Sequence, residues 1–313
     1  MKTLAFFNPK SRFGKTTLVY HLAWMLADKG IDTLVLDLDP QATLTSLFLP
    51  EERLAQLWRA GDSPDTISGA IAARMRGEVA PLPVEQIADH LTLGVGDPNL
   101  ACFESAFAED WLTLNAGGAV MTAFHQLIAR TPHTVVLLDL GGNLGAINRA
   151  ALLAADQIMT PLVAERFAPF ALQQIGASLE MWRTEWQKRL LLCSADTRAN
   201  APQGKMQPSG YMVIQRNVRD RWLEKLPAAY QTAMYGEANN APLLADDPHK
   251  LASLRYEYSL IQLATEARKP MFFLKSADGA VGSSQEAVRS CYQDFEQLAA
   301  KIAANAGIAF PNS

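Results

Sequence analysis

The feature that most constrains this chain is a short polar run near its amino end, between an apolar stretch and an amphipathic one. Residues 8–17 read Asn-Pro-Lys-Ser-Arg-Phe-Gly-Lys-Thr-Thr, after the apolar residues 4–7 and before the amphipathic stretch 18–27. A helix N-terminus presents unpaired N–H groups and the positive end of its dipole, which suits a phosphate. Lys15 can add charge near the β- and γ-phosphates, and Thr16 can place its hydroxyl on Mg²⁺. The run therefore predicts a nucleoside-triphosphate site.

This signal departs from the usual phosphate-loop pattern. That pattern has a glycine five residues before the glycine of Gly-Lys-Thr, and Pro9 stands there instead. Gly-Lys-Thr alone is common at ordinary helix starts, so a capped helix is the plainer alternative. The strand–loop–helix context and a second lysine, Lys10, four residues before Gly14, favour the phosphate site.

The second lysine also brings in a resemblance to a known family. The spacing Lys-x-x-x-Gly-Lys-Thr-Thr over residues 10–17 resembles the deviant Walker A loop of the ParA/MinD group of P-loop ATPases. Later segments resemble further motifs of that group in the same order: its Asp-x-Asp-Pro-Gln segment at 33–41, its Walker B strand at 134–142, the strand after Walker B at 155–165, and a late Lys-Pro segment leading into an apolar strand at 267–274. Several ordered matches arise by chance far less often than one.

The resemblance implies that the ligands are ATP and Mg²⁺, and it assigns residues to them. Asp39 stands where the family has the residue that positions the attacking water, so the candidate catalytic residues are Lys10, Lys15 and Asp39. The candidate metal residues are Thr16, Asp37 and Asp139. The carboxylates of Asp37 and Asp139 would be costly to bury at strand ends without a partner. The candidate nucleotide contacts are Lys10, Ser11, Arg12, Phe13, Gly14, Lys15, Thr16 and Thr17, with Asn217 near the adenine.

Lys10 carries a further implication of the resemblance. In the family, the matching lysine reaches across a dimer to the partner's nucleotide, as an arginine finger does in trans. The resemblance therefore implies an ATP-dependent homodimer, in which each subunit neutralises the other's phosphates. The alternative is that Lys10 is a loop lysine that contacts only the nucleotide of its own subunit, or none.

Two departures from the family bear on the rate of hydrolysis more than on nucleotide binding. Ser11-Arg12 replaces the family's Gly-Gly, and a side chain forced into left-handed geometry costs roughly 1–2 kcal/mol. Gly141-Gly142 replaces the family's Pro-Pro after the Walker B aspartate, which loosens the loop near the γ-phosphate.

Apolar runs and helical stretches alternate through the chain, which predicts an α/β fold with a doubly wound, mostly parallel sheet and helices on both faces. We expect a single domain over 1–313 with a helical insertion at about 51–89. The strand candidates are 3–7, 33–38, 91–95, 135–140, 157–161, 211–214 and 271–274. The helix candidates include 17–29, 119–130, 170–191, 221–234, 258–267 and 285–304.

Composition limits which partners and which cellular compartment we expect for this chain. The net charge is −4, so any binding to nucleic acid must come from a local patch. The three cysteines lie far apart, with no metal-binding spacing and an odd count that argues against a disulfide framework. No apolar run reaches the length of a membrane span, and the start of the chain lacks a signal-peptide layout. We therefore expect a cytoplasmic protein without a membrane partner.

A basic stretch is the candidate surface for nonspecific DNA. Residues 183–225 hold nine Lys or Arg and four Asp or Glu, a local net charge of +5. A cationic face of this kind would bind phosphate backbones without reading sequence, and salt would weaken it. The alternative is an ordinary solvated surface, because these residues need not share one face.

These observations leave two main hypotheses. The first is a ParA-like ATPase with slow, partner-stimulated hydrolysis, whose ATP-dependent dimer binds DNA or a partner protein for DNA partition or cargo positioning. The second is a nucleotide-gated regulatory or scaffold subunit of a neighbouring effector system, with slow or no turnover. A metabolic P-loop enzyme shares the fold, but the sequence carries no substrate signature for it.

Overall fold

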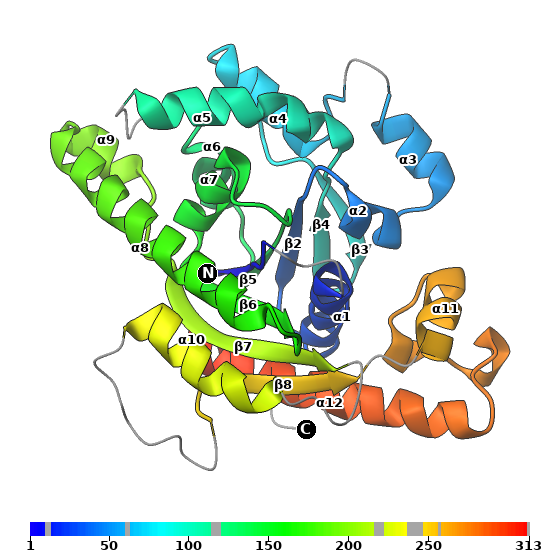
Figure 1. Cartoon of the computed structure of the whole chain (residues 1–313). Coiled ribbons are helices and arrows are strands. Elements are labelled where there is room, and N and C mark those ends of the chain that lie inside the picture. Colours follow the sequence, from blue (N-terminus) through cyan, green and yellow to red (C-terminus); the bar gives the residue numbers. More distant parts are fainter. Residues whose placement is uncertain are drawn as a thin grey trace.

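A parallel sheet forms the centre of the molecule (Figure 1). The computed structural model describes residues 1–9, 14–59, 63–113, 120–215, 222–236, 247–255 and 258–311. Within these residues, eight strands run in the order β3-β4-β2-β5-β1-β6-β7-β8, and β3 alone is antiparallel to its neighbour. The strands are β1 (Lys2–Phe6), β2 (Thr33–Leu38), β3 (Val84–Ala88), β4 (Leu91–Gly94), β5 (Val135–Leu140), β6 (Gln157–Val163), β7 (Gln207–Gln215) and β8 (Lys250–Arg255).

Successive residues of the central strands enter two different cores, because strand side chains point to opposite faces in turn. In β1, Leu4 and Phe6 join the core beneath α1 (Lys15–Asp28) and α12 (Ser283–Ala306). Ala5 joins the core on the other face. Every residue of β2 and β5 is buried, which explains why these strands read as continuous apolar runs.

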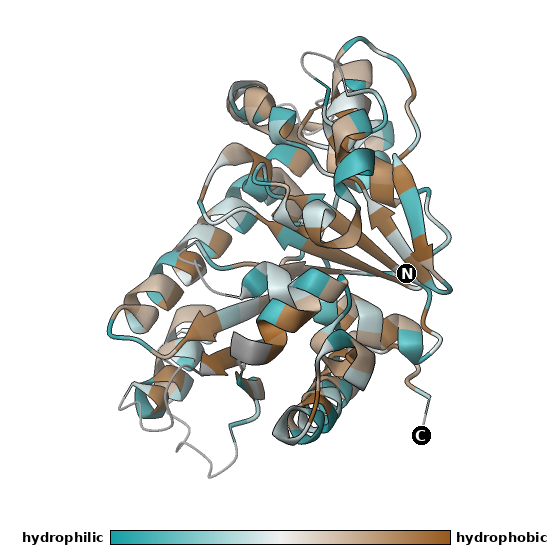
Figure 2. Ribbon diagram, turned by 90° about the vertical axis from the view of Figure 1, so that its right-hand side faces the viewer, coloured by the Kyte–Doolittle hydropathy of each residue, from teal (hydrophilic) through white to brown (hydrophobic). Residues whose placement is uncertain are grey.

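Helices cover both faces, and in Figure 2 the strands between them are mostly brown, the colour of apolar residues. The second face carries α5 (Glu104–Leu112), α6 (Ala123–Ile128), α7 (Ala146–Ala154), α8 (Ala168–Leu192) and α10 (Leu226–Tyr235). The shorter elements are α2 (Thr43–Phe48), α3 (Glu51–Leu57), α4 (Ile67–Met75), η1 (Pro98–Phe103), α9 (Ala195–Asn200), η2 (Leu223–Lys225), α11 (Tyr258–Ala267), η3 (Met271–Phe273) and η4 (Ser276–Asp278). The predicted doubly wound, mostly parallel α/β sheet is confirmed.

The strand predicted at 271–274 is wrong. Met271–Phe273 forms a single 3₁₀ turn between extended residues, and it pairs with no strand. Met271 and Phe272 are buried against α1 and α12, so the run is apolar because it fills the core beneath the helices. A short apolar run reports burial, and burial alone does not distinguish a strand from a buried turn.

The region predicted as a helical insertion, 51–89, holds α3 and α4 but ends in a strand. β3 pairs antiparallel with β4 across a turn in which His90 has a φ of 61°. The sequence patterns also missed β8, an edge strand whose buried Leu251 and Leu254 lie among polar or partly exposed neighbours. No helix among the described residues combines the length and the apolar character that crossing a bilayer requires.

Candidate functional site

Three neighbouring strands bring the predicted site residues to one edge of the sheet. β2, β5 and β1 lie side by side and parallel, so their carboxyl ends meet at the same edge, where ligands of such sheets bind. Asp37 of β2 stands directly opposite Asp139 of β5, and Phe6 of β1 stands on the other side of Asp139. Gly14 then leads into α1 at the same edge, with a φ of 80° that favours glycine.

The first turn of α1 is bound to the end of β5. The Lys15 ammonium donates to Asp139 Oδ1 in an ion pair whose side chains are only 3% and 0% exposed. The Thr16 hydroxyl donates to Asp139 Oδ2 at 2.7 Å. One buried carboxylate therefore holds the two side chains that the sequence assigned to phosphate and metal. A buried ion pair persists only where geometry and extra hydrogen bonds offset desolvation, and Thr16 supplies such a bond.

Asp37 is as deeply buried as Asp139, but its carboxylate has different hydrogen-bond partners. Its carboxylate accepts hydrogen bonds from the backbone N–H groups of Thr45 at 2.7 Å and Asp39 at 3.3 Å. Burial, with a smaller contribution from the negative charge of Asp139, raises the pKa of Asp37 to about 7. Gly96 packs so closely that a Cβ there would lie 2.6 Å from the Asp37 carbonyl oxygen. The site therefore contains a carboxyl that lacks a charge partner among the described residues.

Asp39 lies at the mouth of the site. Its side chain is partly exposed and accepts from the backbone N–H of Gln41 at 3.0 Å, which shapes the turn into α2. A Cβ built on Gly141 would lie 3.5 Å from Asp39 Oδ1. The loops that follow β2 and β5 therefore lie close to each other at Asp39.

The loop after Asp139 is held by a residue that the sequence analysis did not single out. Asn148 of α7, 1% exposed, accepts from the Gly141 N–H at 3.1 Å and donates to the Gly141 carbonyl at 2.9 Å. It also donates to the carbonyl of Asn143 at 2.8 Å. The only sequence signal for this contact is indirect: a Gly-Gly loop needs an anchor from elsewhere.

Several predicted site residues fall outside the described part of the chain. These are Lys10, Ser11, Arg12, Phe13 and Asn217. Thr17 is described: its carbonyl accepts from His21 Nδ1 at 2.7 Å.

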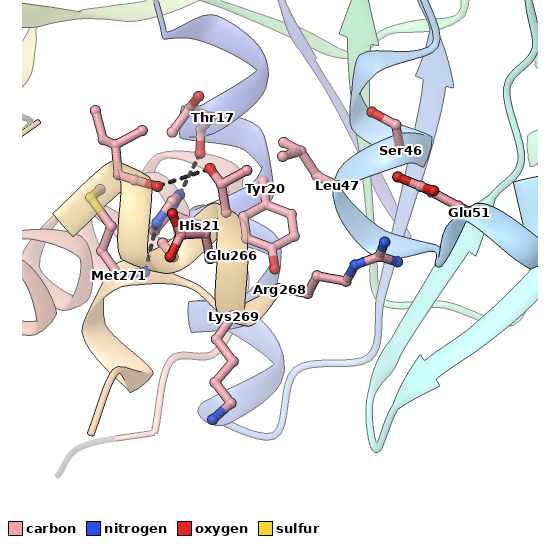
Figure 3. A pocket seen from close by; sticks show the side chains of 13 residues that line it. Thr17, Tyr20, His21, Ser46, Leu47, Glu51, Glu266, Arg268, Lys269 and Met271 are labelled. Carbon is pink, nitrogen blue, oxygen red and sulfur yellow. Dashed lines mark hydrogen bonds between the residues drawn. The ribbon is translucent and has the colours of Figure 1, made fainter. Parts of the chain in front are cut away.

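A cavity of about 340 Å³ opens beside the first turns of α1, and Figure 3 shows the side chains around it. Thr17 borders it, but none of the four charged residues Lys15, Asp37, Asp39 and Asp139 does, so it lies next to the candidate phosphate site. His21 forms part of its wall as a structural residue, since its second ring nitrogen accepts from the Met271 N–H at 2.9 Å. The cavity is lined by residues of α1, α2, α3, α11 and η3 and of the turn between α11 and η3, namely Thr17, Tyr20, His21, Ser46, Leu47, Glu51, Ile261, Ala264, Thr265, Glu266, Arg268, Lys269 and Met271.

The basic residues predicted to form a DNA patch serve several internal roles. Arg189 is buried, and its guanidinium stacks 4.0 Å from the centre of the Trp111 ring. Arg198 donates to backbone carbonyls at the end of α8. Arg216, Arg219 and Arg221 lie outside the described residues. Among the described residues of this stretch, Lys188, Lys205 and Lys225 are exposed, whereas Arg189 is buried.

The oxygen atoms gathered at this edge of the sheet are suitable ligands for a hard cation such as Mg²⁺. Hydroxyl and carboxylate oxygens from Thr16, Asp37 and Asp139 meet at one sheet edge, and Mg²⁺ in nucleotide sites takes few protein ligands and completes its shell with phosphate oxygens and water. No cluster of three or more His, Cys, Asp or Glu that could hold a metal by itself occurs among the described residues. The site therefore fits a metal that arrives with a phosphate ligand.

The doubly wound sheet, the helix that starts after Gly14 and the pairing of Lys15 with Asp139 are together typical of a P-loop nucleoside-triphosphatase. Comparison with known families agrees: the model described as AAA domain (AAA_31) matches residues 1–192. The chain belongs to this family, as a ParA-like P-loop ATPase.

Several relatives are named as chromosome partitioning proteins. Protein IncC of Escherichia coli is 28% identical over 201 residues, which cover 64% of this chain and 52% of IncC. The chromosome partitioning protein ParA of Caulobacter vibrioides is 27% identical over 195 residues, 61% of this chain and 66% of that protein. The aligned part thus spans between half and two thirds of these relatives.

Solved structures share the fold. A protein from Corynebacterium diphtheriae superposes with a TM-score of 0.73 at 19% identity, covering 98% of this chain and 99% of that one. An ATP complex of a variant of McdA from Cyanothece gives a TM-score of 0.66 at 16% identity, covering 100% and 99%. Cobyrinic acid a,c-diamide synthase from Mycobacterium smegmatis, with ADP and magnesium, gives 0.54 at 21% identity, covering 74% and 83%.

Proposed function

We propose that this chain binds ATP with Mg²⁺ at the carboxyl edge of β1, β2 and β5 and hydrolyses it slowly. The observation that carries the proposal is the contact of buried Asp139 with Lys15 and Thr16 at the first turn of α1. ATP in the McdA complex, and ADP with magnesium in the synthase complex, support the choice of ligands.

Lys15 is the proposed contact to the β- and γ-phosphates. Its ammonium is buried and already paired with a carboxylate, so a triphosphate would offer a second anion to a cation that is held in place. The backbone N–H groups of the first turn, from Gly14 onward, would bind the phosphate oxygens. We assign the remaining nucleotide contacts to the loop from Lys10 to Phe13 and to Thr17, with Asn217 near the adenine.

Thr16, Asp37 and Asp139 are the residues that would hold the magnesium ion, which supplies neutralisation of the phosphate charge. Asp139 keeps the Thr16 hydroxyl at the helix start. Asp37 contributes a buried carboxyl next to Asp139, fixed by two backbone N–H groups. Together they give the metal side of the site a preset geometry.

Asp39 is the proposed residue that orients the attacking water. It is partly exposed at the mouth of the site, and the Gln41 N–H fixes its side chain. Phosphoryl transfer needs positioning and charge stabilisation more than covalent chemistry from the protein, and a held carboxylate suffices for positioning.

We further propose that ATP closes a homodimer in which Lys10 reaches the partner's phosphates, and that this dimer binds nonspecific DNA or an activating protein in the cytoplasm. The chromosome partitioning role named for ParA of Caulobacter vibrioides supports this proposal. A single domain over 1–313 remains our prediction for the chain.

The test measures dimerisation and DNA binding by the wild type and by Lys10→Ala, with and without ATP, at two salt concentrations. We expect binding that requires ATP, falls steeply with salt and weakens in Lys10→Ala, while ATP affinity of the monomer stays within about threefold. Lys2→Ala, at an exposed strand start on the opposite edge, is the matched control. Equal dimerisation by Lys10→Ala and wild type would remove the trans role.

A second candidate is a nucleotide-gated regulatory or scaffold subunit with little turnover. The internal use of Arg189 and Arg198 favours it, because these cations are engaged within the chain. The same experiment separates the two candidates: an ATP-bound dimer that ignores DNA at low salt supports the second.

A further inference from the structure

We infer that Asn148 is a positioning residue for hydrolysis: it fixes the Gly141-Gly142 loop against Asp39. This inference rests on the proposed ATPase function and adds a residue to it. Asn148 touches no reacting group in this arrangement, and it would act through the backbone of Gly141 and the carboxylate of Asp39.

Both polar atoms of the Asn148 side-chain amide form hydrogen bonds with the backbone of the loop. Its Oδ1 accepts from the Gly141 N–H at 3.1 Å, and its Nδ2 donates to the carbonyls of Gly141 at 2.9 Å and Asn143 at 2.8 Å. Its side chain is 1% exposed, so water cannot readily replace these bonds. Buried backbone groups left unpaired are costly, which makes this contact a strong constraint on the loop.

Two glycines in succession need such a constraint. Glycine loses more conformational freedom on ordering than any other residue, so a Gly-Gly segment is loose unless other groups hold it. Gly141 is absent from the glycines with positive φ, and a Cβ there would meet its nearest neighbours at 3.4–3.5 Å. The backbone at Gly141 therefore has a shape that alanine could also adopt, and its order comes from Asn148.

The rest of the loop is anchored in the same way. Asn143 Oδ1 accepts from the Gly145 N–H at 2.7 Å. The Glu104 carboxylate accepts from the backbone N–H groups of Ala146 and Ile147 at the start of α7. An acidic side chain at a helix N-terminus is favourable, so α5 and α7 meet through this contact. The loop is thus fixed at its beginning by Asn148 and at its end by Glu104.

The loop matters for catalysis because of what it lies beside. A Cβ added at Gly141 would come within 3.5 Å of Asp39 Oδ1, so the loop backbone passes close to that carboxylate. Lys15 and Thr16 are held instead by Asp139, on the strand before the loop. Loosening the loop would therefore disturb the water-positioning carboxylate and leave the phosphate contacts in place. The expected signature is a loss of rate without a matching loss of affinity.

The experiment uses Asn148→Asp, Asn148→Ser and Asn148→Ala in the full chain. Asn148→Asp keeps an acceptor for Gly141 but loses both donors, and Asn148→Ser is the smaller, polar replacement should the aspartate variant not fold. Asn305→Asp is the control, since the Asn305 side chain, at the carboxyl end of α12, makes one exposed hydrogen bond, to the Ser209 carbonyl. We expect single-turnover hydrolysis of Mg-ATP to fall at least about tenfold in the Asn148 variants, with Kd changed less than about threefold.

Rescue distinguishes positioning from a general loss of structure. Gly141→Ala restricts the loop without needing a positive φ, so adding it to Asn148→Ala should recover at least about threefold of the lost rate. Unchanged hydrolysis in folded Asn148 variants, a parallel loss of rate and affinity, or a wild type that binds ATP without turnover would each overturn the inference. A wild type that binds no ATP would instead overturn the proposed function itself.

Discussion

Asp37 and Asp139 stand opposite each other on adjacent strands, both fully buried, yet they are neutralised in different ways. Asp139 is paired with the Lys15 ammonium and the Thr16 hydroxyl. Asp37 has two backbone N–H groups and no cation among the described residues, and its pKa is raised to about 7. One carboxylate organises the first turn of α1, and we propose that the other receives a cation from outside.

The difference shows how one site can both stabilise the start of α1 and keep a carboxyl available for a cation. A buried charge without a counter-charge costs free energy, and functional sites commonly retain such groups. The Lys15–Asp139 pair keeps the first turn of α1 in place before a ligand arrives. Asp37 stores an unfavourable interaction that a bound cation would relieve. The predictions below alter these two carboxylates and their partners, from the largest expected effect to the smallest.

Removing the paired carboxylate should be the most damaging change. Asp139→Ala would leave the Lys15 ammonium buried and unpaired, so we expect the free energy of unfolding to fall by about 3–5 kcal/mol. Urea unfolding measures it. Glu78→Ala breaks the exposed Arg76–Glu78 pair and should leave the free energy of unfolding close to that of the wild type. Similar decreases in the free energy of unfolding in the two variants would show that the buried Lys15–Asp139 pair stabilises the fold no more than the exposed Arg76–Glu78 pair does.

Asp37→Asn should have the opposite sign, and its effect should depend on pH. The folded-state pKa of about 7 lies above the ordinary value, so the folded wild type binds the extra proton and its stability falls as pH rises from about 4 to about 7. The substituted amide would not titrate, so the variant should gain roughly 2–4 kcal/mol relative to wild type between those limits. Unfolding free energies near both limits measure this gain. Parallel pH profiles for the two proteins would contradict it.

The smallest effect concerns Thr16. Thr16→Val loses the 2.7 Å hydrogen bond to Asp139, which should cost about 1–2 kcal/mol, whereas Thr16→Ser keeps the hydroxyl and should stay close to wild type. Thermal unfolding of both variants measures the difference. A serine variant as unstable as the valine variant would assign the effect to lost packing of the methyl group.

The sequence predicted the sheet best where strands are buried on both faces. The bounds of β2 and β5 match the prediction, because their apolar runs are continuous and polar residues end them. The same signal failed at 271–274, where the apolar residues fill the core as a turn beneath α1 and α12. β8 was missed because an edge strand with polar residues lacks that run.

Within the site, the sequence predicted which residues belong to the site, but not their hydrogen-bond and ion-pair partners. The motifs single out Lys15, Thr16 and Asp139, and in the structure these three side chains are in contact. The Asn148 and Glu104 contacts join residues far from the motifs, so no local pattern could show them. Likewise, residue counts over 183–225 could not reveal that Arg189 is buried on Trp111.

Calorimetric titration of the wild type and Lys15→Ala with Mg-ATP tests the account most directly. We predict clear heat of association for the wild type and at least about a hundredfold weaker binding by Lys15→Ala, with Lys188→Ala unchanged. No heat with the wild type, or equal affinity in Lys15→Ala, would contradict the claim that this helix start binds the triphosphate.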